Sequence, residues 1–179
     1  MTGQNFNRGE RRMVSKFNLS RLMPFSWLLC IGLLAGGVAA TSALAGKDET
    51  SRFEKISTVL VERGVGALEK NQTDDARRLL EQAVTANPHN AMAYSYLGLA
   101  AQRAGDTERA KKYFSLALDI DPNELHALSW GGQADLSSAD LDGAQAKLQR
   151  LARLCGPGCA EYKLLSEQVG SYKSKSSAN

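Results

Sequence analysis

Two cysteines near the end of the chain are the residues best suited to chemistry. Cys155 and Cys159 stand four positions apart around the sequence Gly-Pro-Gly, a turn too rich in helix breakers to be helical. The glycines let the two sulfurs approach, so in an exported chain we expect a disulfide worth about 2 kcal/mol. Metal binding and thiol redox chemistry are the alternatives. The only histidines, His89 and His126, lack the spacing of metal ligands.

No catalytic constellation accompanies the cysteines. The sequence has no glycine-rich phosphate loop, no nucleophile elbow and no histidine with a carboxylate partner nearby. The acid pair Asp74 and Asp75 suits the dipole at a helix start, and Asp119 and Asp121 are solvated beside a proline turn. We therefore expect no enzyme activity, no metal and no cofactor.

The first 45 residues have the layout of a secretory signal. A basic stretch precedes an uncharged run that begins at Met23 and ends in small residues, with Ala43 and Ala45 forming a small-x-small cleavage site. Residues 1–45 are therefore predicted to be a signal peptide. The alternative is an uncleaved membrane anchor over 23–45, because the run is long enough to span a bilayer. In either case the rest of the chain would lie on the side of the membrane away from the cytoplasm, in the periplasm or outside the cell.

The remainder of the chain has balanced charge. Residues 1–45 hold five of the 22 basic and one of the 19 acidic residues, which leaves 17 basic and 18 acidic residues after them. A net charge of −1 without a basic stripe argues against nucleic acid as a partner.

The elements that must position these residues repeat with a period of 34. The segments 57–90 and 91–124 agree position by position, and a third copy over 125–158 is degenerate, with Asp135 in place of alanine and Gly156 in place of proline. The matching pairs are Gly64 and Gly98, Ala67 and Ala101, Ala76 and Ala110, Ala83 and Ala117, Pro88 and Pro122, Leu60 and Tyr94, and Leu80 and Phe114. Their spacings of three and four place them on one face of each helix.

This order of large and small residues with a closing proline resembles the tetratricopeptide repeat family, in which each repeat is a pair of antiparallel helices. The resemblance implies an all-α solenoid of about three helical hairpins over residues 46–172, preceded by a signal or anchor helix. A capping helix over 160–172 would cover the last repeat, because its apolar residues from Tyr162 to Tyr172 fall on one face. The polar tail 173–179 is predicted to be disordered.

Turn and cap residues predict where the helices begin and end. Ser51 and Glu54 have the spacing of a capping box, so the first repeat helix should begin near Arg52. Gly64 and Gly66 inside this helix cost up to about 1 kcal/mol each relative to alanine, so close packing is expected to offset both. The breaks and caps expected further along are Thr73, Asn90, Gly105, Asp106 or Thr107, Pro122 and the turn over 138–140.

In this family, partners commonly lie in the concave groove that the first helices of the repeats line. Carrying those positions over gives Val61, Val65, Met92, Ser95, Tyr96, Leu99, Arg103, His126, Ser129, Trp130 and Gln133. Tyr96 and Trp130 stand 34 residues apart and would form an aromatic ridge that anchors a partner, unless Trp130 is core against the capping helix. Some relatives clamp a peptide carboxylate with basic and amide side chains, and the matching positions here hold Val61, Val65, Tyr96, His126 and Trp130. An apolar extended peptide or an amphipathic helix is therefore the expected partner.

These features together predict a non-enzymatic scaffold or adaptor that acts in the bacterial cell envelope by holding a protein or peptide in this groove. One alternative is a self-assembling structural protein whose repeat ends stack on one another. A thiol redox protein that uses Cys155 and Cys159 is a further alternative.

Overall fold

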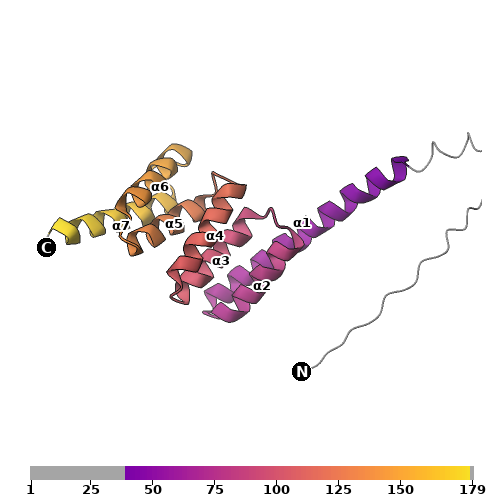
Figure 1. Ribbon diagram of the computed structural model, residues 1–179, viewed down its shortest axis with the longest axis horizontal. Coiled ribbons are helices and arrows are strands. Elements are labelled where there is room, and N and C mark those ends of the chain that lie inside the picture. The colour runs from indigo at the N-terminus through magenta and orange to yellow at the C-terminus, as the bar shows by residue number, and fades with distance from the viewer. Residues whose placement is uncertain (1–38, 178–179) are drawn as a thin grey trace, which may run out of the picture. The chain divides into compact units, whose positions relative to one another are not determined.

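The computed structural model describes residues 39–177, and this part of the chain consists of seven α-helices with no strand among them (Figure 1). The helices are α1 (Ala39–Glu69), α2 (Thr73–Ala86), α3 (Ala91–Arg103), α4 (Thr107–Ile120), α5 (Leu125–Ser137), α6 (Leu141–Leu154) and α7 (Ala160–Ser177). The chain divides into two units after Ser42, and the second unit, Ala43–Asn179, contains α2 to α7 and most of α1. The predicted all-α solenoid of helical hairpins is confirmed.

The first two hairpins each close around a glycine and a large side chain. A Cβ added at Gly64 would lie 2.8 Å from Leu80, and one added at Gly98 would lie 2.4 Å from Phe114. The alanines of the second helices are fully buried, namely Ala76, Ala83, Ala110 and Ala117. These small residues let the paired helices approach closely. An added Cβ at Gly66 meets nothing within 4 Å, so the packing role predicted for Gly66 is wrong.

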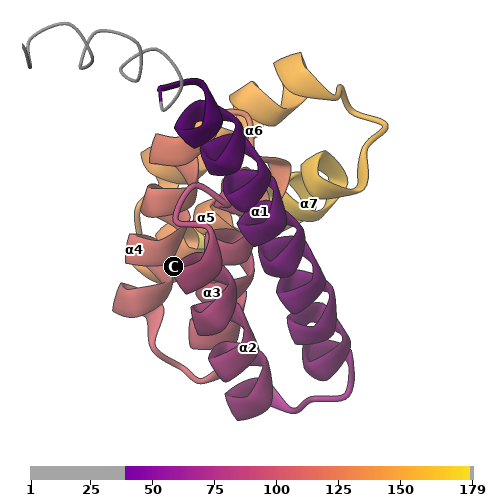
Figure 2. The same cartoon turned by 90° about the vertical axis from the view of Figure 1, so that its right-hand side faces the viewer.

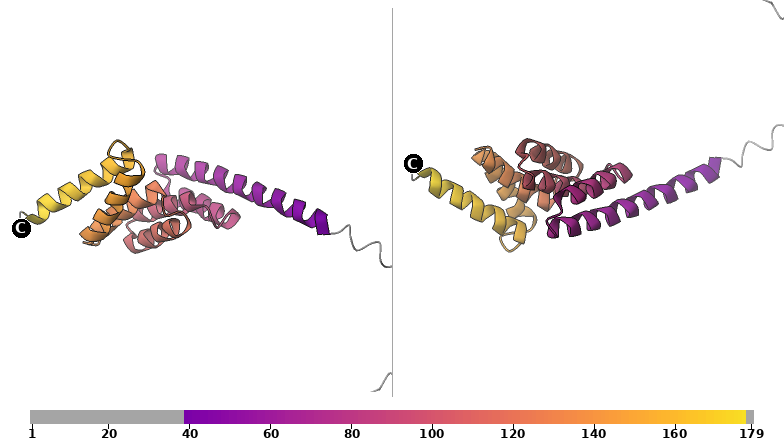
Figure 3. Two further views of the ribbon diagram at one scale, coloured as in Figure 1. Left: turned by 90° about the horizontal axis from the view of Figure 1, so that it is seen from above. Right: turned by 90° about the horizontal axis from the view of Figure 1, so that it is seen from below.

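Successive hairpins share their cores. One buried cluster joins α1, α2 and α3, a second joins α3, α4 and α5, and a third joins α5, α6 and α7. Figure 2 shows the short turn that links α1 to α2, and Figure 3 shows the hairpins following one another along the unit. Because α3 and α5 each contribute to two clusters, the first helices of neighbouring repeats are held side by side.

The turn inside each hairpin has the same backbone conformation. Asn71, Gly105 and Ala139 stand 34 residues apart, and each has a positive φ, of 58°, 81° and 60° respectively. In each turn the next residue donates its backbone N–H to the carbonyl five positions earlier, at 2.9 Å. This is the bonding of a Schellman motif, in which the left-handed residue ends the helix. Glycine adopts this conformation without strain, whereas alanine does not.

We expect Ala139→Gly to raise the free energy of unfolding by about 1 kcal/mol, because it removes the steric cost of a left-handed alanine. Gly105→Ala should lower it by a similar amount, since it introduces that cost at the equivalent turn. Urea denaturation monitored by circular dichroism measures both changes. Equal destabilisation by the two substitutions would contradict this explanation.

The expected N-caps are confirmed at Asn90 and Asp106. Their side chains accept the backbone N–H of the third residue after them, at 3.1 Å and 3.0 Å. The prediction for Thr73 is wrong, because Thr73 is the first residue of α2 and the N-cap is Gln72, whose side chain makes no capping bond. Gln72 occupies the same repeat position as Asp106, and α2 begins at the same repeat position as α4, although glutamine is a poor N-cap.

The helix α1 begins at Ala39, so the prediction of a start near Arg52 from the capping box of Ser51 and Glu54 is wrong. No proline lies between Ala39 and Ser51, and nothing in that sequence obliges the helix to restart. Of the predicted signal peptide or anchor, residues 1–38 lie outside the described part of the chain. Among the residues from Ala39 on, no helix is both long and apolar enough to cross a membrane.

The helix α7 covers the last hairpin through one face, as the spacing predicts. Leu165 and Val169 are buried with α5 and α6, and Tyr162 and Tyr172 pack against the same cluster. The helix continues to Ser177, so the predicted disorder over 173–179 is wrong for residues 173–177. No glycine or proline interrupts the chain after residue 170, and polar residues remain helical there while exposed to water.

Candidate functional site

The residues predicted for the groove lie on α1, α3 and α5, the first helices of the three hairpins. Their accessibility differs. Met92 and Arg103 are exposed, Val65, Tyr96, Leu99, His126, Trp130 and Gln133 are partly buried, and Val61, Ser95 and Ser129 are buried. A partner can touch the first two sets but not the third.

Three of these residues form one cluster, which we call the aromatic face: Tyr96 of α3 with His126 and Trp130 of α5. The ring centroids of Tyr96 and Trp130 lie 5.2 Å apart at an interplanar angle of 64°, an edge-to-face contact. His126 stacks on Trp130 at 4.7 Å and 11°, and lies 5.5 Å from Tyr96. Because Tyr96 and Trp130 share a repeat position, the side-by-side packing of α3 and α5 brings them together.

Trp130 is held in place by the protein core. It packs against the buried cluster of α3, α4 and α5, where its ring centroid lies 6.5 Å from that of Phe114. This cluster is not the one that includes the capping helix α7, which is where the alternative reading placed Trp130. The remaining surface of the indole is accessible, so Trp130 serves both as part of the stack between repeats and as part of the aromatic face.

Two hollows of about 320 Å³ each lie along α5, and one of them reaches the aromatic face. The first is lined by Met92, His126 and Glu161 together with the start of α5. The second lies between α5 and α7 and is lined by Gln133 and Tyr172 among others. Each is large enough to accept a side chain from a partner.

Val61, Ser95 and Ser129 do not line an open surface, so their assignment to the groove is corrected. Val61 is 3% exposed and belongs to the first buried cluster. The Ser95 hydroxyl donates to the Glu124 carboxylate at 2.6 Å, and the Ser129 hydroxyl donates to the Glu161 carbonyl at 3.1 Å. Each serine is the residue directly before an aromatic-face residue, and the helical rotation of one position turns it toward a neighbouring element.

Arg103 is the basic member of the predicted set, and its guanidinium is already engaged. It donates to the backbone carbonyl of Leu68, near the end of α1, at 2.6 Å. A cation is favourable at a helix C-terminus, where the last carbonyls lack partners within the helix. The contact joins α3 to α1, and Val65 and Leu99 of these two helices both pack against the first buried cluster.

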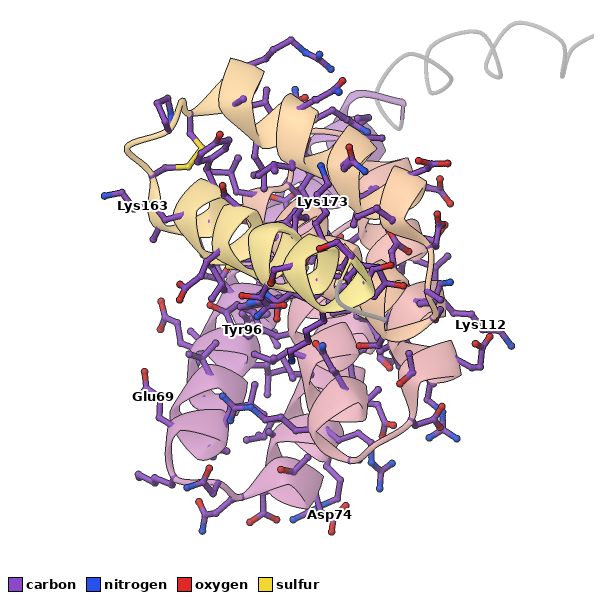
Figure 4. All side chains as sticks on the ribbon, turned by 90° about the vertical axis from the view of Figure 1, so that its left-hand side faces the viewer. Glu69, Asp74, Tyr96, Lys112, Lys163 and Lys173 are labelled. Carbon is purple, nitrogen blue, oxygen red and sulfur yellow. A yellow bond between two sulfur atoms is a disulfide. The ribbon has the colours of Figure 1, made fainter. Side chains whose placement is uncertain are left out.

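Carboxylates dominate the charge around the aromatic face. The Oε1 atom of Glu161 lies 3.6 Å from Nδ1 of His126, and Glu69 stands at the end of α1 (Figure 4). Burial raises the pKa of the Tyr96 phenol above 10.0, and the negative charges of Glu124, Glu69 and Glu161 raise it further because they disfavour the phenolate. Tyr96 is therefore protonated at neutral pH and remains a hydrogen-bond donor.

Cys155 and Cys159 lie at the turn between α6 and α7, where the structure pairs their sulfurs and places their Cα atoms 5.8 Å apart (Figure 4). Oxidation of the pair in solution stays a prediction. We expect the peptides that carry both cysteines to resist alkylation in the purified protein until a reductant is added. Labelling of both before reduction, measured by mass spectrometry, would contradict the disulfide. Among residues 48–177, histidine, cysteine and acidic side chains form no group of three that could bind a metal.

Glu69, Glu124 and Glu161 are the residues of this site that sequence reasoning missed. Glu124 carried a usable signal, because it stands 34 residues after Asn90 and caps α5 as Asn90 caps α3. It accepts the backbone N–H of Ala127 at 2.5 Å. Glu161 carried none, since only the packing of α7 on α5 brings it to His126.

Comparison with known proteins agrees with this architecture. Residues 61–124 match a family model described as tetratricopeptide repeat. Among curated proteins, no match to the sequence is found.

Solved structures with the same arrangement of helices include the first TPR domain of Spaghetti (RPAP3) bound to the HSP90 peptide SRMEEVD, with a TM-score of 0.62, 21% identity, and coverage of 70% of this chain and 96% of that one. The Sgt2 TPR domain from Aspergillus fumigatus has a TM-score of 0.60 and 26% identity, and the match covers 69% of this chain and 82% of that one. A third structure is the Yersinia enterocolitica type III secretion chaperone SycD in complex with a peptide of the translocator YopD. It has a TM-score of 0.55 and 19% identity, and the match covers 64% of this chain and 87% of that one.

Proposed function

Since the chain carries tetratricopeptide repeats, we propose that it is a non-enzymatic scaffold that holds a segment of another protein against the aromatic face. The observation that carries this proposal is the contact of Tyr96, His126 and Trp130 on neighbouring first helices, with each ring partly open to solvent. Aromatic side chains anchor interfaces because they bury a large area at a small cost in side-chain entropy. The rigid stack beneath them presents the rings in one fixed arrangement, which lowers the entropic cost of binding.

Peptide complexes of proteins with this fold support the proposal. The RPAP3 domain is bound to an HSP90 peptide and SycD to a peptide of YopD. Here the positions of a carboxylate clamp hold Val61, Val65 and the three rings, so the partner is expected to contribute apolar side chains from an extended segment or an amphipathic helix. The hollow lined by Met92, His126 and Glu161 provides space for such a side chain at the aromatic face, and the hollow between α5 and α7 provides space for another further along α5.

The setting of this activity follows from the N-terminal sequence. The basic stretch, the uncharged run and the small residues before Gly46 support export, which would place the repeats in the periplasm of a Gram-negative envelope. Retention of the run as an inner-membrane anchor would leave the repeats on the same side of the membrane.

Self-assembly is the second candidate function, and one observation favours it. Phe53, Ile56 and Val59 of α1 are 52%, 47% and 52% exposed, although they are large and apolar. A second copy could cover these residues at the end of the stack. Light scattering over a range of concentrations separates the two functions, because a polymer grows with concentration whereas a monomeric scaffold does not.

Tyr96→Ala and Trp130→Ala are expected to weaken binding of the partner about tenfold each, because each removes one anchor ring from the interface. The measurement is recovery of envelope proteins on the tagged full chain, followed by mass spectrometry. Leu116→Ala serves as the matched control, because Leu116 is a large exposed residue on α4, a second helix. If both ring variants recover the same proteins in the same amounts as the original chain, the partner binds at another surface.

A further inference from the structure

The carboxylates that border the aromatic face differ in what already binds them. Glu124 is buried, and its oxygen atom Oε2 accepts hydrogen bonds from Ser95 and from the backbone of Ala127. The Glu124 carboxylate therefore already accepts hydrogen bonds within the fold. Among residues 48–177, the side chains of Glu69 and Glu161 accept no hydrogen bond.

Glu161 is the carboxylate that touches the rings. Its Oε1 atom stands 3.6 Å from Nδ1 of His126, too far for a hydrogen bond, and its side chain is 21% exposed. Part of its capacity to accept hydrogen bonds therefore remains available to a partner. Glu69, at the end of α1, is exposed, and its negative charge also acts on Tyr96.

The basic residue predicted for this surface is directed to another group. The guanidinium of Arg103 donates to the backbone carbonyl of Leu68. Burial and the negative charges of Glu124, Glu69 and Glu161 raise the pKa of the Tyr96 phenol. A surface of aromatic rings bordered by carboxylates that accept no hydrogen bond from the described part of the chain is suited to a cation. The faces of Trp and Tyr rings attract a positive group through their quadrupoles, and a carboxylate beside them adds a direct ion pair.

We propose that the partner segment presents a lysine or arginine side chain to the aromatic face, where the cation lies against Trp130 and Tyr96 and pairs with Glu161. This inference rests on the proposed function and specifies its ligand as an apolar segment that carries at least one basic residue. Charge complementarity selects this occupant over an acidic segment, because an acidic group would lie beside the negative charges of Glu161 and Glu69.

A randomised peptide library retained on the immobilised full chain tests the charge preference. We expect lysine and arginine to be enriched, and aspartate and glutamate to be depleted, in the peptides that bind. The enrichment should disappear in the double variant Glu69→Gln with Glu161→Gln and persist in Glu167→Gln, an exposed glutamate of the same helix α7. For one retained peptide, replacement of its basic residue by glutamine should weaken binding about threefold to thirtyfold.

The possible outcomes separate the inference from the function on which it rests. Retained peptides without basic enrichment, whose binding still depends on Tyr96 and Trp130, would overturn the inference and leave the scaffold function intact. Enrichment that survives in the double variant would overturn the assignment to Glu161 and Glu69. Failure of the library to bind, or binding that is unchanged in Tyr96→Ala and Trp130→Ala, would overturn both. Circular dichroism of each variant confirms that the fold is retained.

Discussion

Lys147→Met is expected to lower the free energy of unfolding by about 3 kcal/mol, because it leaves a buried carboxylate without its main partner. The Asp135 side chain is 7% exposed, and its Oδ2 atom accepts a hydrogen bond from the ammonium of Lys147 at 2.5 Å. Lys111 lies further away, at 3.9 Å from Oδ1. Methionine is an unbranched side chain only one atom shorter than lysine and provides no charge, so the loss of stability reports mainly the carboxylate left without Lys147. Urea denaturation of both proteins gives the difference.

The matched control is the double variant Asp135→Ala with Lys147→Met. Ala67 and Ala101 occupy the same repeat position as Asp135, so alanine there is compatible with the packing of a hairpin. Removing both charges should restore most of the lost stability, because replacement of a whole buried pair is often neutral. Equal destabilisation in the single and double variants would show that the packing of the Lys147 chain, and not the buried charge, is responsible.

Gly98→Ala is expected to lower the free energy of unfolding by about 2 kcal/mol, although alanine forms helix more readily than glycine. The new Cβ would stand 2.4 Å from the Phe114 ring, and that ring is 1% exposed and packed on all sides. The ring cannot move aside cheaply, so α3 and α4 must separate. Thermal and urea denaturation of the variant measure the loss.

Gly66→Ala is the control for this substitution, since it is also in a helix interior. An added Cβ at Gly66 meets nothing within 4 Å, so only the helix propensity changes. We expect a gain of about 1 kcal/mol there. An increase in the free energy of unfolding of Gly98→Ala as well would show that the contact with Phe114 does not determine the effect of this substitution.

The boundaries of α2 to α6 were largely predictable, because the residues that set them act locally. A proline ends a repeat at Pro88 and Pro122, Asn90 caps the next helix, and Gly105 supplies the left-handed turn. The start of α1 was not predictable in this way. A capping-box pattern at Ser51 competes with a helix that is already in progress, and the tendency of a helix to continue is the stronger effect.

The aromatic face was predictable only in part. The spacing of Tyr96 and Trp130 identified two of its rings, because equal positions in stacked repeats lie side by side. The groove positions carried over from the family also included Val61, Ser95 and Ser129, which are buried. Family positions indicate which helix carries a residue, whereas the accessibility of its side chain depends on the element packed beside it.

The sequence by itself determined the period of 34, the helical hairpins and the small residues that let them close, because size and turn propensity are properties of single residues and their near neighbours. Tertiary structure alone decided that Asp135 is buried against Lys147 and that Glu161 reaches His126 from α7. It also decided which of the carboxylates near Tyr96 accept hydrogen bonds within the fold. These contacts join residues on different helices, and their geometry depends on how the helices pack, which no local spacing records.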